Sequence, residues 1–463
     1  MTGANLRATM ADVFGGSAIE ELAREYGVVA RTTARNITRL VLAFVLNGGT
    51  HEAGRQCDVL RMYVTSGAKR VVRSTFYEWF TTPLERLLTE MLRRAMAHAA
   101  TLALTLPKAL AGQLDWWIFD STVVRLPDVA KLLEAYPGCG DYAAVKVHKL
   151  YSIGLGNLVR YHFSPARDHD GPHLVLDESW RGRGLIADLA YVSIARLHEC
   201  LRFNVRFIFR LKTGWKPRID RIVRGRAGGF LPNEIEFPLQ LETGLLTPEN
   251  GEIDADVTFG NGANEVHARL VGFVVPGGGL HLFLTDLPRE THAPSLVSEI
   301  YRVRWEIEID NRVDKSGARL DEIDAEKPVS VRIMLLASLI NATLARIIVH
   351  REHVALRVEM AEEDLDEPTR PPLHPILVLR AMATMCALVE TLVREGQNAK
   401  GDAAPDDLDV WNAKLRDIRA LGHDPNWRRR PSVLDRLLGL TGKPARKRRE
   451  KLVAGDTVRV EDS

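Results

Sequence analysis

Apolar residues at three- and four-residue spacing dominate the first hundred residues, which predicts a series of amphipathic helices there. The spacing is clear over residues 17–46, where arginines occupy the polar positions. Thr75–Glu78 fits a capping box, and Thr82 followed by Pro83 predicts the start of a long helix over 84–104. Short helices with a basic face are typical of DNA-binding regions, although a helical domain with a solvated basic side fits the pattern equally well.

The period changes near residue 114, where short apolar or alternating runs predict strands. Strand-like runs occupy 115–124, 146–155, 158–166, 184–191 and 204–212, and helical runs occupy 173–180 and 193–203. Gly154–Asn157 is a plausible hairpin turn between the second and third strands. Consecutive strands followed by alternation with helices predict a mixed sheet with helices packed on it.

A second β-rich block follows, and the chain then returns to helices. Alternating segments at 234–243, 252–260, 265–275 and 280–287 are separated by turns rich in Gly, Asn and Pro. Helical patterns resume at Ser295 and continue to about residue 353. An acidic and then Pro-rich stretch over 361–375 marks a linker or domain edge, and a further helix precedes a basic tail.

These patterns divide the chain into five parts with different composition. We expect an α/β protein that is organised as follows: a helical DNA-binding region at 1–110, the first part of a mixed-sheet core at 111–213, a β-rich insertion at 214–290, the second part of the core at 291–355, and a helical region with a basic tail at 366–463. The tail, with Arg446–Arg449, contacts DNA or is simply a solvated terminus.

Composition narrows the class of protein only slightly. The 463 residues carry 62 Lys and Arg against 60 Asp and Glu, so the net charge of +2 indicates no strong bias toward nucleic acid. Four widely spaced cysteines argue against a disulfide framework and fit a reducing cytoplasm. The longest apolar stretches, 40–49 and 334–349, are short or interrupted by polar residues, so we expect no membrane span and a cytoplasmic location.

Two aspartates follow buried strand patterns and are candidates for chemistry. Asp120 ends the apolar run WWIF, and Asp188 follows GLIA. An acid at the end of a buried strand is partly desolvated and needs compensation, and two such acids at one sheet edge suit Mg²⁺ or Mn²⁺. For each acid taken alone, a turn cap or a partner of Arg is the favoured interpretation.

A third candidate comes from the helical pattern near residue 300. At about 100° per residue, four polar side chains fall within one stripe roughly 60° wide, and they are Tyr301, Arg304, Glu308 and Lys315. Glu306, Asp310 and Asp314 fall off that stripe, which is why Glu308 is preferred. A solvated, salt-bridged stripe is the alternative interpretation.

The residues of this stripe resemble a family motif. The pattern Y-x2-R-x3-E-x6-K is similar to the signature of DDE transposases of the insertion-sequence-four family. WWIFDST resembles the family's first-aspartate strand, IADLAY its second, FIFRLK the strand after it, and LFLTDLP the strand before the signature helix. The resemblance covers roughly residues 70–350 and includes the position of the β-rich insertion.

This resemblance implies an RNase H-like core in which Asp120, Asp188 and Glu308 hold two Mg²⁺ ions, for which Mn²⁺ can substitute. It also implies cut-and-paste transposition on double-stranded DNA, both transposon ends and target, by a homodimer in the DNA complex. The location is then the cytoplasm, on chromosomal DNA. A catalytically inactive relative that binds transposon ends as a regulator is the alternative.

The resemblance also implies which side chains contact DNA. Tyr301, Arg304 and Lys315 hold phosphates near the transposon end. Relatives that cut through a DNA hairpin stack a flipped base on an aromatic residue before the LFLT strand, where this chain has His281.

Three histidines near residue 165 are a weaker candidate for a metal site. His162, His169 and His173 include a ligand-like His-x3-His spacing, but the flanking Asp, Gly and Pro residues favour a loop.

Overall fold

The structure, a computed structural model, describes most of the chain. The described residues are 1–14, 18–28, 37–46, 56–65, 70–211, 215–227, 239–240, 246–274, 279–317, 320, 323–382, 385, 388–389, 392 and 406–441. The basic tail after residue 441, including Lys443, Arg446–Arg449 and Lys451, lies outside these residues.

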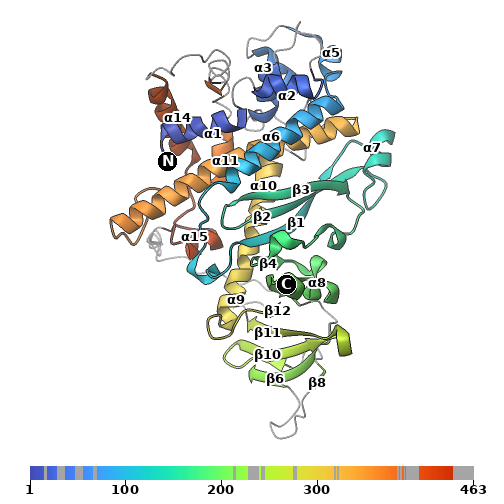
Figure 1. Cartoon of the computed structure of the whole chain (residues 1–463), viewed down its shortest axis with the longest axis vertical. Helices are drawn as coiled ribbons and strands as arrows, with labels where there is room; N and C mark the ends of the chain where they lie inside the picture. The colour runs from blue at the N-terminus through green and yellow to red at the C-terminus, as the bar shows by residue number, and fades with distance from the viewer. Residues whose placement is uncertain are drawn as a thin grey trace, which may run out of the picture.

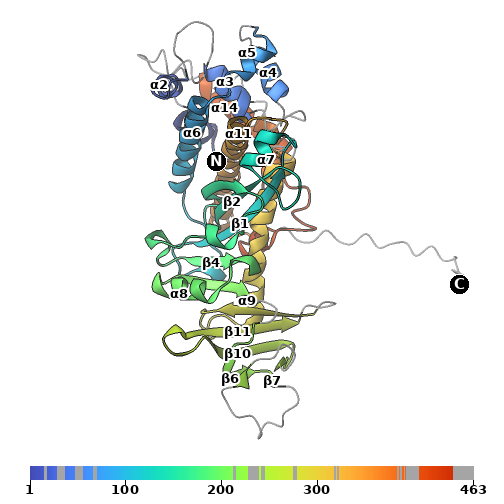
Figure 2. The ribbon, with the colours of Figure 1, turned by 90° about the vertical axis from the view of Figure 1, so that its right-hand side faces the viewer.

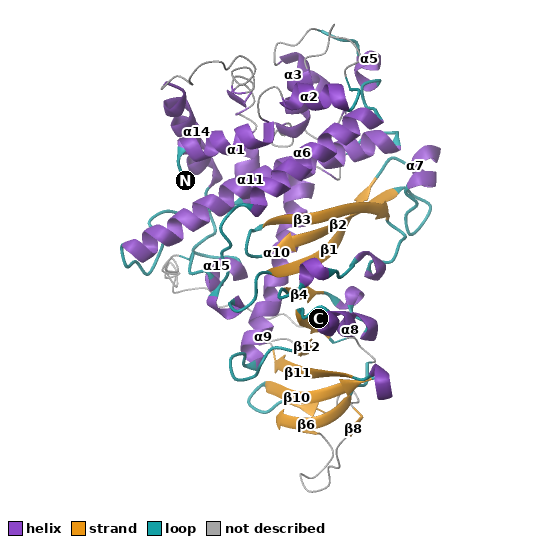
Figure 3. Ribbon diagram, in the orientation of Figure 1, coloured by secondary structure: helices purple, strands orange, loops and turns teal. Residues whose placement is uncertain are grey.

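A twisted sheet runs through the middle and lower part of the molecule as drawn in Figures 1 and 3. Its strand order is β3-β2-β1-β4-β5-β12-β11-β10-β6-β8. The first five of these strands are β1 (Trp116–Arg125), β2 (Ala144–Ser152), β3 (Asn157–Pro165), β4 (Gly184–Ala187) and β5 (Arg206–Arg210). Strands β1, β2 and β3 are antiparallel, whereas β4 and β5 run parallel to β1. This mixed arrangement is consistent with an RNase H-like fold.

The strands form where the sequence alternates or runs apolar. On β1, Trp116 and Ile118 pack into a core with the helices after residue 293, while Trp117 and Phe119 pack into a second core on the other face. Both faces of the sheet are therefore covered at this point, which explains the continuous apolar run. The predicted hairpin is confirmed, because Ser152 of β2 pairs with Asn157 of β3.

The β-rich segment extends the same sheet. Its strands are β6 (Arg218–Arg224), β8 (Leu239–Gln240), β10 (Glu252–Phe259), β11 (Val266–Val274) and β12 (Leu280–Thr285). Strand β12 pairs antiparallel with β5, and β11, β10 and β6 follow in order. Two very short strands, β7 (Arg226–Ala227) and β9 (Leu246–Thr247), pair separately. Figure 2 shows these strands as the end of the molecule farthest from the N-terminal helices.

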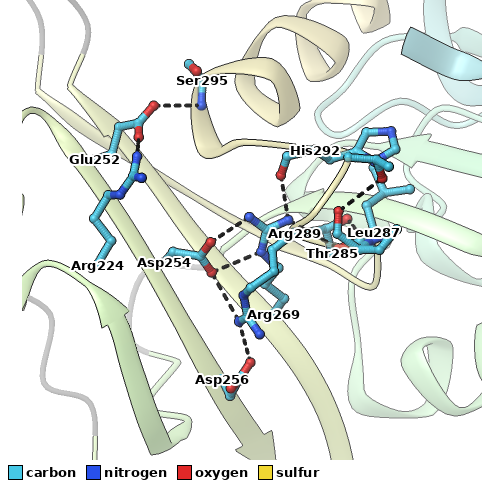
Figure 4. A network of polar contacts seen from close by, with 12 residues as sticks. Arg224, Glu252, Asp254, Asp256, Arg269, Thr285, Leu287, Arg289, His292 and Ser295 are labelled. Carbon is cyan, nitrogen blue, oxygen red and sulfur yellow. Dashed lines mark hydrogen bonds and ion pairs between the residues drawn. The ribbon is translucent and has the colours of Figure 1, made fainter. Parts of the chain in front are cut away.

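An ion network fixes this extension to the helix that follows it (Figure 4). Arg269 on β11 binds both carboxylate oxygens of Asp254 on β10, at 3.0 and 2.6 Å, and donates to the carbonyls of Leu287 and His292. Glu252 accepts from the backbone N–H of Ser295 at 3.2 Å. A carboxylate at a helix N-terminus is favourable, so the network fixes the start of the helix at residue 294.

Helices make up the other end of the molecule. They are α1 (Gly3–Phe14), α2 (Ala18–Glu25), α3 (Ile37–Leu46), α4 (Gln56–Thr65), α5 (Arg73–Tyr77), α6 (Thr82–Ala100), α11 (Pro328–Glu362), α12 (Pro375–Met382) and α14 (Asp406–Gly422). Helices α6 and α11 lie side by side across this region in Figures 1 and 3. Helix α11 is long and apolar enough to cross a membrane, but its most apolar window is entirely buried in the protein. It is therefore the central helix of a core.

Smaller helices lie on the sheet, and some local predictions were wrong. Helix α7 (Ala130–Ala135) follows β1, and α8 (Ile194–Arg202) confirms the helical run predicted over 193–203, with Ser193 as its N-cap. The segment 173–180 is not a helix, because it forms 3₁₀ turns at Gly171–His173 and Glu178–Trp180 instead. Thr75 is not a cap, since α5 begins at Arg73, and the residue before α6 is Thr81.

Candidate active site

Asp120 and Asp188 lie next to each other on neighbouring parallel strands. Strands β1 and β4 are paired up to Phe119 and Ala187, and each aspartate is the next residue. Adjacent strands are roughly 4.8 Å apart, so the two carboxylates leave the sheet side by side. Strand β1 continues past Asp120 along β2 to Arg125, which confirms the strand-like run predicted over 115–124. Asp120 ends the apolar run, and it is the first residue of β1 beyond the pairing with β4.

The segment that carries Tyr301, Arg304 and Glu308 is not one continuous α-helix. It consists of α9 (Pro294–Tyr301), a 3₁₀ turn (Arg302–Arg304), α10 (Trp305–Arg312) and a π turn (Val313–Gly317). A 3₁₀ turn advances by about 120° per residue and a π turn by less than an α-helix, so the ideal angles do not hold over its length. The predicted stripe is consequently only partly preserved.

Three of the four stripe residues meet the strand-end acids. The Tyr301 hydroxyl lies 3.4 Å from Oδ1 of Asp188. Arg304 Nη2 donates to Oε1 of Glu308 at 2.7 Å, and the Arg304 guanidinium lies close enough to Asp188 for a charge interaction. Asp120 in turn experiences the charges of Arg304, Asp188 and Glu308. The structure thus brings together three acids, one cation and one phenol from two strands and one helical segment.

Electrostatics at this site are unfavourable for three ionised acids. Burial, together with the negative charges of Asp188 and Glu308, raises the pKa of Asp120 to about 6. The charge of Arg304 lowers this pKa by more than either acid alone raises it, and burial is the largest cause of the rise. A divalent cation would relieve the repulsion among the three acids, and carboxylate oxygens are the hard ligands that Mg²⁺ and Mn²⁺ prefer. The residues present therefore fit a divalent metal.

An aromatic run leads away from the acids along β12. The Phe283 ring lies 4.7 Å from that of Tyr301, and the half-buried His281 ring lies 6.5 Å from that of Phe283. Burial raises the pKa of Tyr301 to about 12, so its hydroxyl remains protonated. His281 is therefore near the site, separated from the acids by two aromatic rings.

Lys315 is the stripe residue that the structure does not join to the others. It lies in the π turn and is half-exposed. Among the described residues, no hydrogen bond or ion pair connects Lys315 with Tyr301, Arg304 or Glu308. Its place on the ideal stripe assumed an unbroken α-helix from residue 301 to residue 315.

The other side of the segment carries acids that are buried and paired. Lys149 on β2 binds Asp310 and lies 2.7 Å from Asp314. Arg346 on α11 lies 2.5 Å from Asp310. All four side chains are at most 6% exposed. This network attaches α10 to β2 and α11, and it thereby holds Glu308 at the sheet edge.

Several of these residues were not predicted from sequence. Lys149 and Asp310 are 161 residues apart, and their pairing required the fold. Arg210, the last residue of β5, is exposed and its charge acts on Tyr301, so it adds a cation at the site. Its position at a strand end, like those of Asp120 and Asp188, is the signal that could have identified it.

Comparison with known proteins supports a DDE transposase. Residues 115–344, which contain the three acids, match the family model described as the transposase DDE domain. The putative transposase InsL of insertion sequence element IS186A from Escherichia coli K12 is 30% identical over 109 residues, and so is the transposase of insertion sequence element IS421 from Escherichia coli. These alignments cover 23% of this chain and only 29% of each relative.

A solved structure is similar at a low level. The piggyBac transposase, in a synaptic complex with hairpin DNA, superposes with a TM-score of 0.44 and 10% identity, over 88% of this chain and 84% of that one. We therefore draw no conclusion about this chain from the piggyBac structure. The assignment rests on the family model and the insertion-sequence relatives.

Proposed function

We propose that this chain is a metal-dependent DNA transposase that cleaves and joins double-stranded DNA at transposon ends by cut-and-paste transposition. The observation that supports this most strongly is the meeting of Asp120, Asp188 and Glu308 inside the part of the chain that matches the transposase DDE domain. We also propose that the chain is a member of the insertion-sequence-four family of DDE transposases.

In this proposal the three carboxylates hold two Mg²⁺ ions, and Mn²⁺ can replace them. Two such ions, when bound, would supply the activation of water or a DNA 3′-hydroxyl for in-line attack and the stabilisation of the leaving oxygen. The chain itself supplies the positioning. The Tyr301 hydroxyl, 3.4 Å from Asp188, orients that carboxylate, and Arg304 orients Glu308 through its hydrogen bond to Oε1.

DNA is held by the side chains around the acids. Arg304 has a planar guanidinium suited to a phosphate, and Arg210 adds positive charge near Tyr301. In this proposal Lys315, farther along the same helical segment, adds a further positive charge for the DNA. His281 contributes a flat ring beside Phe283 that can stack on a base. The N-terminal helical region binds DNA outside the active site, and two chains act together on paired ends.

A cleavage assay tests the proposal. The full chain is incubated with DNA that carries its transposon ends and Mg²⁺, and wild type is compared with Asp188→Ala and Glu308→Ala. We expect metal-dependent cutting by wild type and none by either variant, with all three proteins binding the DNA. Cutting that survives both substitutions would overturn the assignment of the acids. DNA binding without cutting by wild type would instead indicate an inactive relative that acts as a regulator.

A further inference from the structure

Three histidines lie together on the side of β1 and β2 that faces away from the acids. His148 on β2 is paired directly with His162 on β3, and His173 ends the 3₁₀ turn after the loop that follows β3. The three ring centroids are 4.1 to 4.7 Å apart. Successive residues of a strand face opposite sides, so His148 points away from the side on which Lys149 meets the helices.

The hydrogen bonds of His148 determine which of its nitrogens carries the proton. The Ser164 hydroxyl donates to the carbonyl of Pro165 at 3.2 Å, so its oxygen is left to accept from Nε2–H of His148 at 2.9 Å. Nδ1 is then unprotonated and has a free lone pair. This nitrogen is buried in a residue that is 0% exposed, and it has no hydrogen-bond partner among the described residues.

The surroundings of His148 and His162 favour neutral rings. Burial and the neighbouring histidines lower the pKa of His148 to about 3, and they also lower the pKa of His162. Lys146 lies 3.0 Å from Asp170, and Arg160 lies 2.8 Å from Asp177. Neutral imidazoles are the form of histidine that binds metal ions.

The geometry is close to that of a three-histidine metal site. One ring nitrogen from each of the three residues lies within 4.8 Å of the others. His162 Nε2 and His173 Nδ1 are 2.7 Å apart, as a hydrogen bond. A tetrahedral zinc ion with bonds of about 2.0–2.1 Å needs nitrogens roughly 3.4 Å apart. The His148 and His162 rings are stacked at 9° to each other, so metal binding requires one of these rings to rotate until its in-plane lone pair points at the ion. A cavity of about 290 Å³ adjoins the rings and has room for a water molecule as the fourth ligand.

We propose that His148, His162 and His173 bind one transition-metal ion of the zinc class through neutral imidazole nitrogens. The ion joins β2, β3 and the 166–174 loop on the side of the sheet away from the acids. That loop also carries Asp170, which accepts from the Ser121 hydroxyl at 2.7 Å, next to Asp120. The metal therefore holds the loop against β1 behind the candidate active site. This site is distinct from the magnesium site and does not depend on it.

Cobalt binding tests the proposal without any measurement of transposition. The full chain is treated with a chelator, titrated with Co²⁺ and monitored by visible absorption, and zinc binding is then measured by competition. We expect one Co²⁺ per chain with the intense spectrum of a four-coordinate nitrogen site, and displacement by Zn²⁺. The Asp188→Ala variant should give the same spectrum, which separates this site from the carboxylates.

Variants of the loop supply the matched comparison. His173→Ala and His162→Gln should weaken Co²⁺ binding at least about tenfold and remove the rise in melting temperature on adding Zn²⁺. His169→Ala, an exposed histidine on the same loop, should behave as wild type. Circular dichroism checks that each variant is folded. His173→Ala and His162→Gln are two independent tests of the same site, so a folding defect in one variant leaves the other as a test. Absence of a four-coordinate spectrum in wild type, or equal binding by His173→Ala and His169→Ala, would overturn the proposal.

Discussion

The two sides of the helical segment 294–317 carry the same kinds of residue in very different settings. On one side, Glu308 meets Asp120 and Asp188 with Arg304 as the nearest cation. On the other side, Asp310 and Asp314 are buried but have Lys149 and Arg346. Asp310 and Asp314 thus have two nearby cations, whereas the three acids at the sheet edge have Arg304 as their nearest cation. Burial raises the pKa of Asp314 to about 6, as it does for Asp120, so the number of cations per acid, and not the pKa, distinguishes the candidate metal site.

The largest expected effect comes from removing a cation on the buried side. Lys149→Met leaves Asp314 buried without its partner, so the free energy of unfolding should fall by about 3–5 kcal/mol. Urea denaturation monitored by circular dichroism measures it. Lys315→Met is the matched control, because that half-exposed side chain should change stability by no more than about 0.5 kcal/mol. Equal effects of the two substitutions would contradict the comparison.

On the side of the segment that meets Asp120 and Asp188, Arg304 should matter for the cleavage reaction and not for the stability of the fold. Arg304→Ala removes the guanidinium between Glu308 and Asp188, and we expect the cleavage rate to fall about 100-fold. Thermal unfolding of the variant should stay close to that of wild type. Arg304→Lys keeps the charge without the planar fork, so it should recover only part of the rate. Full recovery by Lys would mean that charge alone is needed.

Glu306 gives a pH-dependent test of the buried side. Burial and Asp435 on α15 (Val433–Leu437) raise its pKa to about 7, and Arg346 only partly offsets this. Its folded-state pKa is above the unfolded value of about 4.3, so its stabilising effect is complete at low pH and is lost as pH rises through 7. Glu306→Gln should therefore raise the free energy of unfolding at pH 8.5 by on the order of 1–3 kcal/mol. At pH 4, where both forms are uncharged, the variant and wild type should be equally stable, and a constant difference at every pH would contradict the assignment.

The smallest expected effect is at the hydroxyl of Tyr301. Tyr301→Phe keeps the ring beside Phe283 but loses the contact with Asp188, which is long at 3.4 Å. We expect the cleavage rate to fall by a few-fold, equivalent to about 0.5–1.5 kcal/mol. Tyr301→Ala also removes the ring and should have a larger effect in the same cleavage assay. If Phe and Ala were equally active, the ring would not position the site.

Local patterns predicted most of the elements and the positions of the strand-end acids. The apolar run before Asp120 and the alternation around the hairpin depend on neighbouring residues, so they were visible in the sequence. The break at Arg302–Arg304 was not, because it depends on packing against other elements. The stripe calculated for an ideal helix therefore held for Tyr301, Arg304 and Glu308 and did not hold for Lys315.

Pairings between distant segments could not be predicted. The ion network of Lys149 and the extension of the sheet through β12 join residues far apart in the chain. The histidine cluster shows the same limit: a spacing of four pointed to His169 and His173, whereas the register of two strands places His148 beside His162. Sequence spacing describes one element at a time, and sites built from several elements need the fold.

The central claim is that Asp120, Asp188 and Glu308 together hold divalent metal. A crystal of the chain soaked in Mn²⁺, with data collected at the manganese absorption edge, tests it most directly. We predict anomalous peaks within coordination distance of all three carboxylates, and loss of those peaks in a crystal of Glu308→Gln. No peak between these acids at a Mn²⁺ concentration that supports DNA cleavage would contradict the account.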